Sequence, residues 1–463
     1  MEKRSRFAGR LIALLLALVL ALPAHAQDTP AVQDTLAALA ADRGCAQEAL
    51  LDEGGFTPGD SVSDWIAIAA GRSGERIETD AYRRALTEYV TQMYRRQGGL
   101  DAVRATQWQR IALAILALGG DPTCVGPDGI DLIADGSYRW TTTDSLGTQG
   151  LNGWIFALIA LDSARFAVPQ NARYSRQTIV TAILSAQEAD GGFGLASGAS
   201  DVDITAMALQ ALAPYRNGTV AYALASGQSV TVSAAADRAL QWLSAQQTAQ
   251  GDFISWGSAN AESTAQVIIA LCALGIDPAA DARFCKNGVS AKDGLLRYRL
   301  DSGLYAHVLS DGADLMATQQ AMLAWLAMQR LADGARSLYD FRPPMEDAVR
   351  EEIAALNREI TEADEQTLRA EADALYARYL ALPAQERSYV FALDRLRAVR
   401  TEAALTADDP AAAYNLRQPG TKPSRGRILP WLCGAAAVPA GAGLILWKRK
   451  RKCTKSHKTS FGK

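Results

Sequence analysis

The sequence predicts an all-α protein in which six helical hairpins form two concentric layers, followed by a three-helix bundle and one membrane-spanning helix. Three observations support this fold class. Apolar and amphipathic helical segments alternate, a glutamine–glycine–phenylalanine element recurs before apolar segments, and a charge-free run lies near the C-terminus. Recurrence of this kind is typical of stacked units, each of which needs its neighbours to bury its apolar face.

The first 26 residues have the three parts of a secretory signal peptide. Basic residues between positions 3 and 10 precede an apolar run at 11–22, and Ala24 and Ala26 form a small-x-small cleavage site. We expect cleavage after about Ala26 and export of the remaining chain. A retained membrane anchor is the alternative, although the run is short for one.

The region 27–342 contains six apolar segments rich in alanine and leucine. They are apolar nearly all round, which is typical of buried helices. The segments are Val62–Ala70, Gln107–Leu118, Gly150–Leu161, Asp203–Ala213, Glu262–Leu274 and Leu315–Met328. Amphipathic segments with charged outer faces lie between them, at Thr79–Arg95, Tyr174–Gln187, Val232–Gln246 and Ala282–Arg299. We expect the apolar helices to close into an inner ring inside the amphipathic ones. An open solenoid is the alternative, but distinct polar capping repeats are not recognisable.

Two kinds of motif carry a resemblance to a known family. The element Q-x3-G-G/D-F occurs at Gln187–Phe193 and Gln247–Phe253, and the helix openings read DVDITAMALQAL and AESTAQVIIALCAL. Over roughly Thr35 to Arg342 the pattern resembles the α/α-toroid of the squalene cyclase and prenyltransferase repeat superfamily. It is most similar to secreted bacterial repeat proteins of the terpene cyclase/mutase type, whose ectodomains stand on stalks.

The resemblance also implies a candidate catalytic pair. Class II terpene cyclases carry D-x-D-D-T-A, in which the middle aspartate is the general acid. Asp201 matches the first aspartate and Asp203 the acid, whereas Ile204 replaces the last aspartate, a supporting group. Because Ile204 cannot polarise the acid and aromatic residues are few, we do not expect an enzyme. The alternative role for Asp203 is to cap a helix, with Glu262 and Asn152 in equivalent places.

If the ring binds a ligand, we expect the site at the mouth where the inner helices begin, since their amides suit anionic or hydrogen-bonding groups. The candidate ligand-binding residues are Asn152, Trp154, Thr205, Trp256, Glu262 and Tyr305. Phe193, Phe253 and Tyr305 have packing at the turn of each repeat as their alternative role. A glycan, a peptide, a corrinoid and a host protein all remain open as ligands, and no cofactor is expected.

Histidine, cysteine and charge narrow the classes of site. His307 is the only histidine between the signal peptide and the basic tail, so we expect no metal site. Four cysteines in the exported part permit three pairings, of which Cys272 with Cys285 is the local one; free thiols are the alternative. The net charge of −3 includes a strongly basic tail, so the rest of the chain is acidic and we expect no nucleic-acid partner.

A second helical region follows at 343–407. It is rich in Glu, Arg and Ala, and its apolar residues have heptad-like spacing, with Pro383 between the last two helices. The turn at Tyr379–Val390 resembles that of three-helix spacer modules in bacterial surface proteins, so we expect a stalk. A dimerising coiled coil is the alternative. The proline-containing stretch 408–427 is expected to be a linker.

The chain ends in a predicted membrane anchor. Ile428–Trp447 contains no charged residue, is long enough to span a bilayer and has Trp431 and Trp447 near its ends. The basic tail at 448–463 should be cytoplasmic, which places the body outside the cell membrane. The sequence thus predicts a single-pass, extracellular binding or adhesion protein. A cyclase or mutase that uses Asp203, and a structural surface spacer, are the alternatives.

Overall fold

The computed structural model describes residues 32–400 and 410–415. The predicted signal peptide, the predicted span and the basic tail lie outside the described residues. Among the residues that are described, no helix is both long enough and apolar enough to cross a membrane.

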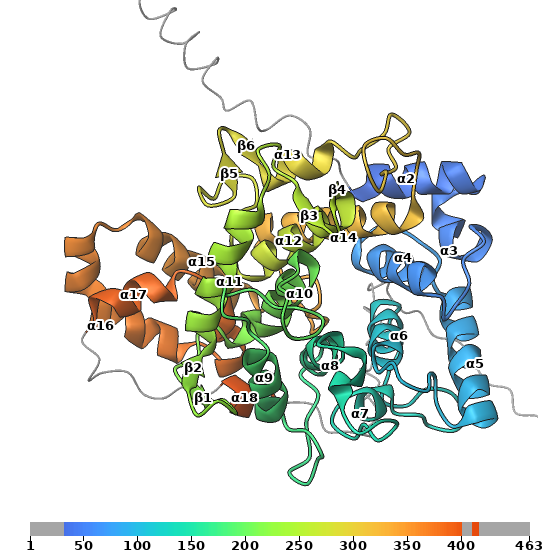
Figure 1. Cartoon of the computed structure of the whole chain (residues 1–463), viewed down its shortest axis with the longest axis horizontal. Coiled ribbons are helices and arrows are strands. Elements are labelled where there is room, and N and C mark those ends of the chain that lie inside the picture. Colours follow the sequence, from blue (N-terminus) through green and yellow to red (C-terminus); the bar gives the residue numbers. More distant parts are fainter. Residues whose placement is uncertain (1–31, 401–409, 416–463) are drawn as a thin grey trace, which may run out of the picture. The chain divides into compact units, whose positions relative to one another are not determined.

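Six helices form a closed inner ring (Figure 1). They are α4 (Ser61–Arg72), α6 (Thr106–Ala117), α8 (Asn152–Asp162), α10 (Val202–Leu212), α12 (Ala261–Ala273) and α14 (Leu315–Ala332). Each helix contacts the next in this order, and α14 contacts α4. These contacts confirm the predicted closed ring and exclude the open solenoid. Small residues allow the close approach: a Cβ atom on Gly71 of α4 would lie 2.3 Å from the carbonyl oxygen of Ala117 in α6.

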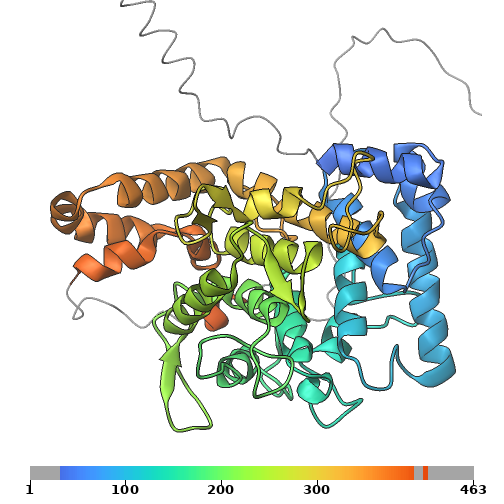
Figure 2. The same ribbon diagram turned by 45° about the horizontal axis from the view of Figure 1, so that its top comes forward.

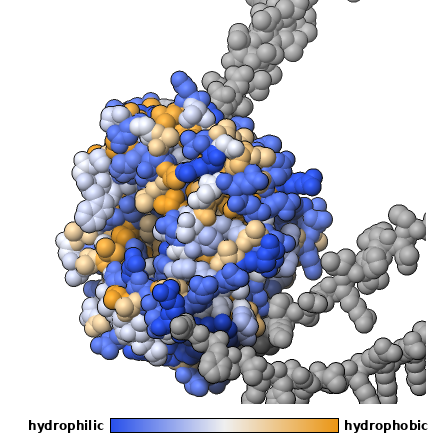
Figure 3. Space-filling model, turned by 90° about the vertical axis from the view of Figure 1, so that its right-hand side faces the viewer, coloured by the Kyte–Doolittle hydropathy of each residue, from blue (hydrophilic) through white to orange (hydrophobic). Residues whose placement is uncertain are grey.

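A second set of helices, which are more polar, surrounds the ring. They are α2 (Val32–Arg43), α3 (Leu50–Glu53), α5 (Asp80–Gln97), α7 (Leu132–Gly136), α9 (Arg176–Ser185), α11 (Val232–Gln246) and α13 (Ala291–Leu296). Most of them pack on the inner helix that precedes them, as α7 does on α6, and α2 completes the layer by packing on α14. Their outer faces are charged, and hydrophilic residues predominate on the side of the molecule that carries α5 (Figure 3). We call residues 32–342 the toroid.

One predicted helix is only partly present. Within Ala282–Arg299, residues Cys285–Lys286 (β5) and Val289–Ser290 (β6) form a hairpin, and only Ala291–Leu296 is α-helical. Asn287 and Gly288 connect the two strands with φ angles of 54° and 79°. Asn-Gly is the preferred pair for a tight hairpin turn, because both residues tolerate positive φ. That local signal overrides the helical periodicity. Two further hairpins join β1 (Ala221–Ala223) to β2 (Ser229–Thr231), and β3 (Phe253–Ser255) to β4 (Ser258–Asn260).

The recurrent sequence element is a structural clamp. At three inner helices, a threonine in the first turn accepts a hydrogen bond from the backbone N–H of the aromatic residue in the preceding loop. The pairs are Thr205 with Phe193 (2.8 Å), Thr264 with Phe253 (3.2 Å) and Thr318 with Tyr305 (3.0 Å). All six residues are fully buried. The packing role of Phe193, Phe253 and Tyr305 is therefore confirmed, and Thr205 and Tyr305 are not placed to contact a ligand.

The C-terminal region forms three helices: α15 (Asp347–Glu362), α16 (Glu365–Ala381) and α17 (Leu393–Val399), which contact one another (Figure 2). We call them the bundle. Apolar residues at the heptad-like positions give it a core of its own, including Ile353, Leu356 and Leu375. The short 3-10 helix η5 (Ala384–Tyr389) follows Pro383 and packs against the toroid at η4 (Ala213–Tyr215).

Part of the predicted linker is docked rather than extended. Residues Pro410–Ala413 form a short helix, α18, and the Tyr414 side chain after it is buried against the toroid. The Tyr414 hydroxyl donates a hydrogen bond to the carbonyl oxygen of Pro214 (2.6 Å), and its ring lies edge-on to Tyr215.

Candidate functional site

The ring encloses a central cavity of about 210 Å³ at the end where the inner helices begin. All six inner helices contribute to its wall. The lining residues are Ser61, Trp65, Thr106, Arg110, Asn152, Phe156, Met207, Gln266, Gln319, Gln320, Leu323 and Tyr339. Three of them form an aromatic group, in which the Trp65 ring centroid lies 5.9 Å from Phe156 and 6.1 Å from Tyr339.

The polar part of the wall consists mainly of amide side chains. Gln210 donates to the side chain of Gln266 and Gln266 donates to that of Gln320, each at 2.9 Å, so hydrogen bonds link α10, α12 and α14. The side-chain oxygens of Asn152 and Gln319 are buried and accept no hydrogen bond from the described residues. A buried acceptor without a partner is costly, so the cavity suits a molecule that brings donors.

Asp201, and not Asp203, caps helix α10. One carboxylate oxygen of Asp201 accepts the backbone N–H groups of Asp203 (2.9 Å) and Ile204 (3.1 Å), and the other accepts the Ser255 hydroxyl (2.6 Å). The capping role suggested for Asp203 is therefore wrong. The error is one of register: Asn260 caps α12 two residues before Glu262, as Asp201 caps α10 two residues before Asp203.

Asp203 is left in an unusual environment for a carboxylate. It is partly buried, and its Oδ1 atom is buried and accepts no hydrogen bond from a described residue. Burial raises the pKa of Asp203 to about 6; the charges of Asp201 and Glu262 add to this rise, and the nearby Ser263 hydroxyl opposes it. Ile204, at the position of the last cyclase aspartate, is buried in the core.

Glu262 occupies the corresponding place on α12 and pairs with His307. The Nδ1 atom of His307 lies 2.9 and 3.0 Å from the two carboxylate oxygens of Glu262. Burial raises the pKa of Glu262, and the hydrogen bond to Glu262 raises the pKa of His307. The loop brings His307 here from 45 residues along the chain, so sequence spacing did not reveal the pair.

Helical spacing puts both acids at the rim of the cavity. Met207 and Gln266 line the cavity, and Asp203 and Glu262 precede them by four residues, one turn nearer the helix start. Residues four apart lie on one face of a helix. The two carboxylates therefore stand above the cavity at its entrance, which we call the mouth.

Three loops precede α10, α12 and α14 and border the mouth on the side of Asp203 and Glu262. We call these loops, residues 193–203, 253–262 and 305–316, the rim loops. Hydrogen bonds tie them together, since Ser255 donates to Asp201 and the backbone N–H of Ala261 donates to the carbonyl of His307. The rim loops contain five acidic residues, one histidine and no lysine or arginine.

The rim loops also expose apolar side chains. In the part of the chain that the structure describes, seven large hydrophobic residues are exposed, and five of them lie in these loops: Leu195, Ile254, Trp256, Leu309 and Met316. Trp256 is 87% exposed and sits at the tip of the β3–β4 hairpin with a φ of 52°. Clustered exposed apolar groups of this kind are typical of interaction sites.

The candidate ligand-binding residues from the sequence separate into three groups. Asn152 is in the cavity wall, whereas Trp256 and Glu262 belong to the rim loops and are not part of the wall. Thr205 and Tyr305 belong to the buried clamps. Trp154 is partly buried and packs edge-on against Tyr174 at 5.0 Å, and it is not part of the cavity wall.

Neither a metal site nor the possible Cys272–Cys285 disulfide is found in the described residues. No group of three or more His, Cys, Asp or Glu side chains there is arranged to hold a metal ion. Cys45, Cys124, Cys272 and Cys285 are all free, so the suggested Cys272–Cys285 bond is not formed. Cys272 is buried within α12, whereas Cys285 belongs to the β5–β6 hairpin.

Comparisons with known proteins identify a solved structure with weak similarity to this chain. No known family profile matches the chain, and no curated protein matches its sequence. Among solved structures, it is similar to Candida albicans protein geranylgeranyltransferase-I complexed with GGPP. The identity is 10%, the match covers 67% of this chain and 93% of that chain, and the TM-score is 0.43. A match this weak carries no argument about function, so the assignment of the ring rests on the helix contacts themselves.

Proposed function

We propose that this protein is an exported, membrane-anchored binding or adhesion protein. Its mouth receives a ligand that combines a positively charged, hydrogen-bond-donating group with an apolar part. One observation carries the proposal: the rim loops combine five exposed large hydrophobic residues with five acidic residues, and they contain no lysine or arginine.

The charge at the mouth argues for a cationic group. The amides of helix starts suit anionic or hydrogen-bonding groups, and the sequence alone predicted a ligand with either kind of group. In the structure, Asp201 occupies the amides of α10 and Asn260 those of α12, and Asp203 and Glu262 add negative charge in front of them. Behind these carboxylates, Asn152 and Gln319 present acceptors without partners. These carboxylates and acceptors favour a donor, and the one cation in the cavity wall, Arg110, is paired with Asp64 (3.1 Å).

The exposed apolar residues argue for an extended ligand. Trp256 and Ile254 project from one hairpin, while Leu195 and Leu309 lie in the neighbouring loops. A peptide segment that contains lysine and leucine supplies both the cationic, hydrogen-bond-donating groups and the apolar side chains. Among the ligand classes that the sequence left open, a peptide or a segment of a host protein is the best supported.

A binding assay with a defined peptide tests the proposal. We would place the full chain in zwitterionic nanodiscs and measure fluorescence anisotropy of a labelled amphipathic Lys/Leu peptide, with empty nanodiscs as background. A Glu/Leu peptide of the same length is the matched ligand control. The Lys/Leu peptide should bind at least tenfold more tightly, and raised salt should weaken its binding.

Variants then locate the interaction. Trp256→Ala should weaken binding about tenfold, as truncation of an exposed aromatic anchor does, whereas Leu380→Ala, which removes an exposed apolar residue of the bundle, should not. Equal binding of the two peptides, or equal behaviour of the two variants, would contradict the proposal.

Acid catalysis is the second candidate, and one observation favours it. The raised pKa of Asp203 and its unbonded Oδ1 are properties of a proton donor. In the cavity below, the aromatic group of Trp65, Phe156 and Tyr339 would stabilise a carbocation, whereas the charge of Arg110 in the same wall would oppose it. Turnover of a polyprene that Asp203→Asn abolishes would establish the enzyme. Absence of both turnover and peptide binding would favour a structural spacer.

A further inference from the structure

A second cavity, which we call the base cavity, lies at the opposite end of the inner helices. It has a volume of about 340 Å³ and is enclosed by the last turns of α8, α10, α12 and α14 together with the bundle. Its wall is largely apolar and includes Ala211, Ile269, Cys272, Ala327, Ile353 and Phe391. Alanines on the helix ends leave the space open, and the bundle covers it without filling it.

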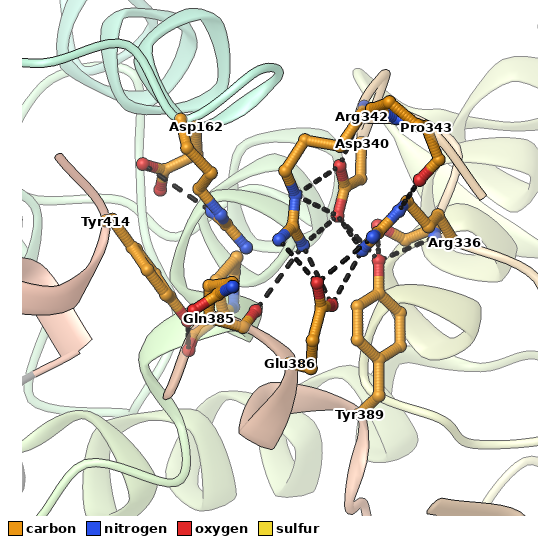
Figure 4. Close-up of polar contacts among 12 residues, drawn as sticks. Asp162, Arg336, Asp340, Arg342, Pro343, Gln385, Glu386, Tyr389 and Tyr414 are labelled. Atoms are coloured by element: carbon orange, nitrogen blue, oxygen red, sulfur yellow. Dashed lines mark hydrogen bonds and ion pairs between the residues drawn. The ribbon is translucent and has the colours of Figure 1, made fainter. Parts of the chain in front are cut away.

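A buried ionic cluster borders this cavity, and the bundle is joined to the toroid through it (Figure 4). The carboxylate of Glu386 in η5 lies between two guanidinium groups, at 2.7 Å from Arg336 and 2.9 Å from Arg342. Asp340 also pairs with Arg342 (2.6 Å), and the Tyr389 hydroxyl donates to Asp340 (2.9 Å). This part of the cluster has balanced charges.

The neighbouring part has an excess of positive charge. Asp162 accepts hydrogen bonds from Arg176 (2.8 Å) and from the Tyr215 hydroxyl (2.8 Å), so its charge is already matched. Arg72 donates to the carbonyls of Ser337, Leu338 and Asp340 and to no carboxylate of the described residues. Burial and the charge of Arg330 lower the pKa of Arg72 to about 10. Burial also disfavours the charge of Arg165, but Tyr414 and Asp162 outweigh it and raise the pKa of Arg165, so this guanidinium stays charged.

Arg165 is a buried cation in the wall of the base cavity whose ion pair with Asp162 is long. It lines the base cavity and is only 2% exposed. Its side chain donates no hydrogen bond to any described residue, and its Nε atom is buried without a partner. The nearest carboxylate oxygen, on Asp162, is 3.7 Å away, and the Tyr414 ring covers the guanidinium at 3.7 Å. Natural proteins rarely bury an arginine without hydrogen bonds.

We propose that the base cavity binds a medium-chain carboxylate, with the head group on Arg165 and the chain along the alanine-lined wall. The planar fork of a guanidinium matches a carboxylate in a bidentate arrangement, and Arg165 has no hydrogen bond to a described residue that such a carboxylate would have to displace. The apolar wall would contact the hydrocarbon chain of the carboxylate. This site is distinct from the mouth, because it lies at the other ends of the inner helices, and Tyr339 is the wall residue that the two cavities share.

Octanoate is a suitable probe, since it is soluble and partitions weakly into detergent. We would titrate the full chain in detergent by calorimetry with octanoate, octanol and octylamine, each against a detergent blank. Octanoate should bind at least tenfold more tightly than octanol, and octylamine should not bind. Arg165→Gln should weaken the binding of octanoate at least tenfold. Asp203→Asn, at the mouth, should leave the affinity for octanoate unchanged.

Two native cysteines report where the probe binds. Cys272 lines the base cavity and Cys124 is exposed elsewhere on the toroid. Octanoate should slow modification of Cys272 by a small thiol reagent and leave Cys124 unaffected. If Arg165→Gln does not fold, Ala273→Leu decides the matter, because it narrows the same cavity and retains the arginine. Equal binding of the three probes, or octanoate binding that survives both variants, would overturn the proposal.

Discussion

Replacement of Asp203 by asparagine should stabilise the protein at neutral pH. The structure raises the pKa of Asp203 from 3.8 to about 6. Each pKa unit corresponds to about 1.4 kcal/mol, so the shift of roughly two units sets an upper limit of about 3 kcal/mol. Because the side chain is partly exposed, we expect a gain below this limit, of about 1–2 kcal/mol at pH 7.

The pH dependence has a definite sign. A carboxyl group whose pKa is raised on folding binds its proton more tightly in the folded state. Asp203 therefore contributes less stability as the pH rises from about 4 through about 6. In Asp203→Asn this loss should disappear, so the free energies of unfolding of variant and wild type should converge below pH 4 and separate above pH 6.

Asp201 provides the control two residues away. Asp201→Ala removes the cap of α10 and should cost about 0.5–2 kcal/mol. Asp201→Asn should be close to neutral, because Asn260 caps α12 in the same way (2.8 Å to the N–H of Ser263). Denaturant unfolding of the four proteins between pH 3 and 8 measures these differences. A loss of stability in Asp203→Asn at pH 7 would refute the reasoning.

Three further predictions concern contacts elsewhere. Glu386→Gln should lower the free energy of unfolding by about 3–5 kcal/mol, because it leaves buried arginines unmatched; Glu365→Gln, at an exposed pair, should cost under about 0.5 kcal/mol in the same denaturant assay. Thr205→Val should cost about 1–3 kcal/mol by leaving a buried backbone N–H unpaired, and Thr205→Ser should retain most of the stability. By NMR, His307 should titrate above 6.5, and Glu262→Gln should lower the pKa of His307. The stability that this pair contributes is present below pH 6.5 and is lost as the pH rises through the raised pKa of His307. A His307 titration that Glu262→Gln leaves unchanged would contradict the contact.

The helical ring was predictable because its signal is long and regular. Each of the six apolar segments coincides with an inner helix to within a few residues, since burial on all sides leaves a continuous apolar pattern. The five-residue helix α7 (Leu132–Gly136) was not predicted, because it is too short to show a period. The Asn287-Gly288 turn was missed because the flanking residues fit an amphipathic helix, and the turn signal should have taken precedence.

The sites were less predictable because they depend on contacts between distant segments. The cyclase-like motif drew attention to Asp203, yet only the structure shows that Asp201 holds the amides and that Ser255 comes from the next repeat to support it. Arg165 and Tyr414 are about 250 residues apart in the chain, and no periodicity connects them. The exposure of Trp256 follows from the hairpin tip on which it sits.

Oxidative footprinting of the tryptophans is the most direct test of the central claim that the mouth binds a cationic, apolar ligand. Trp256 is 87% exposed, and Trp65, in the cavity wall, is partly buried. The Lys/Leu peptide in zwitterionic nanodiscs should reduce oxidation of Trp256 at least fivefold, and the Glu/Leu peptide should not change it. Unchanged oxidation of Trp256 at a saturating concentration of the Lys/Leu peptide would contradict the account.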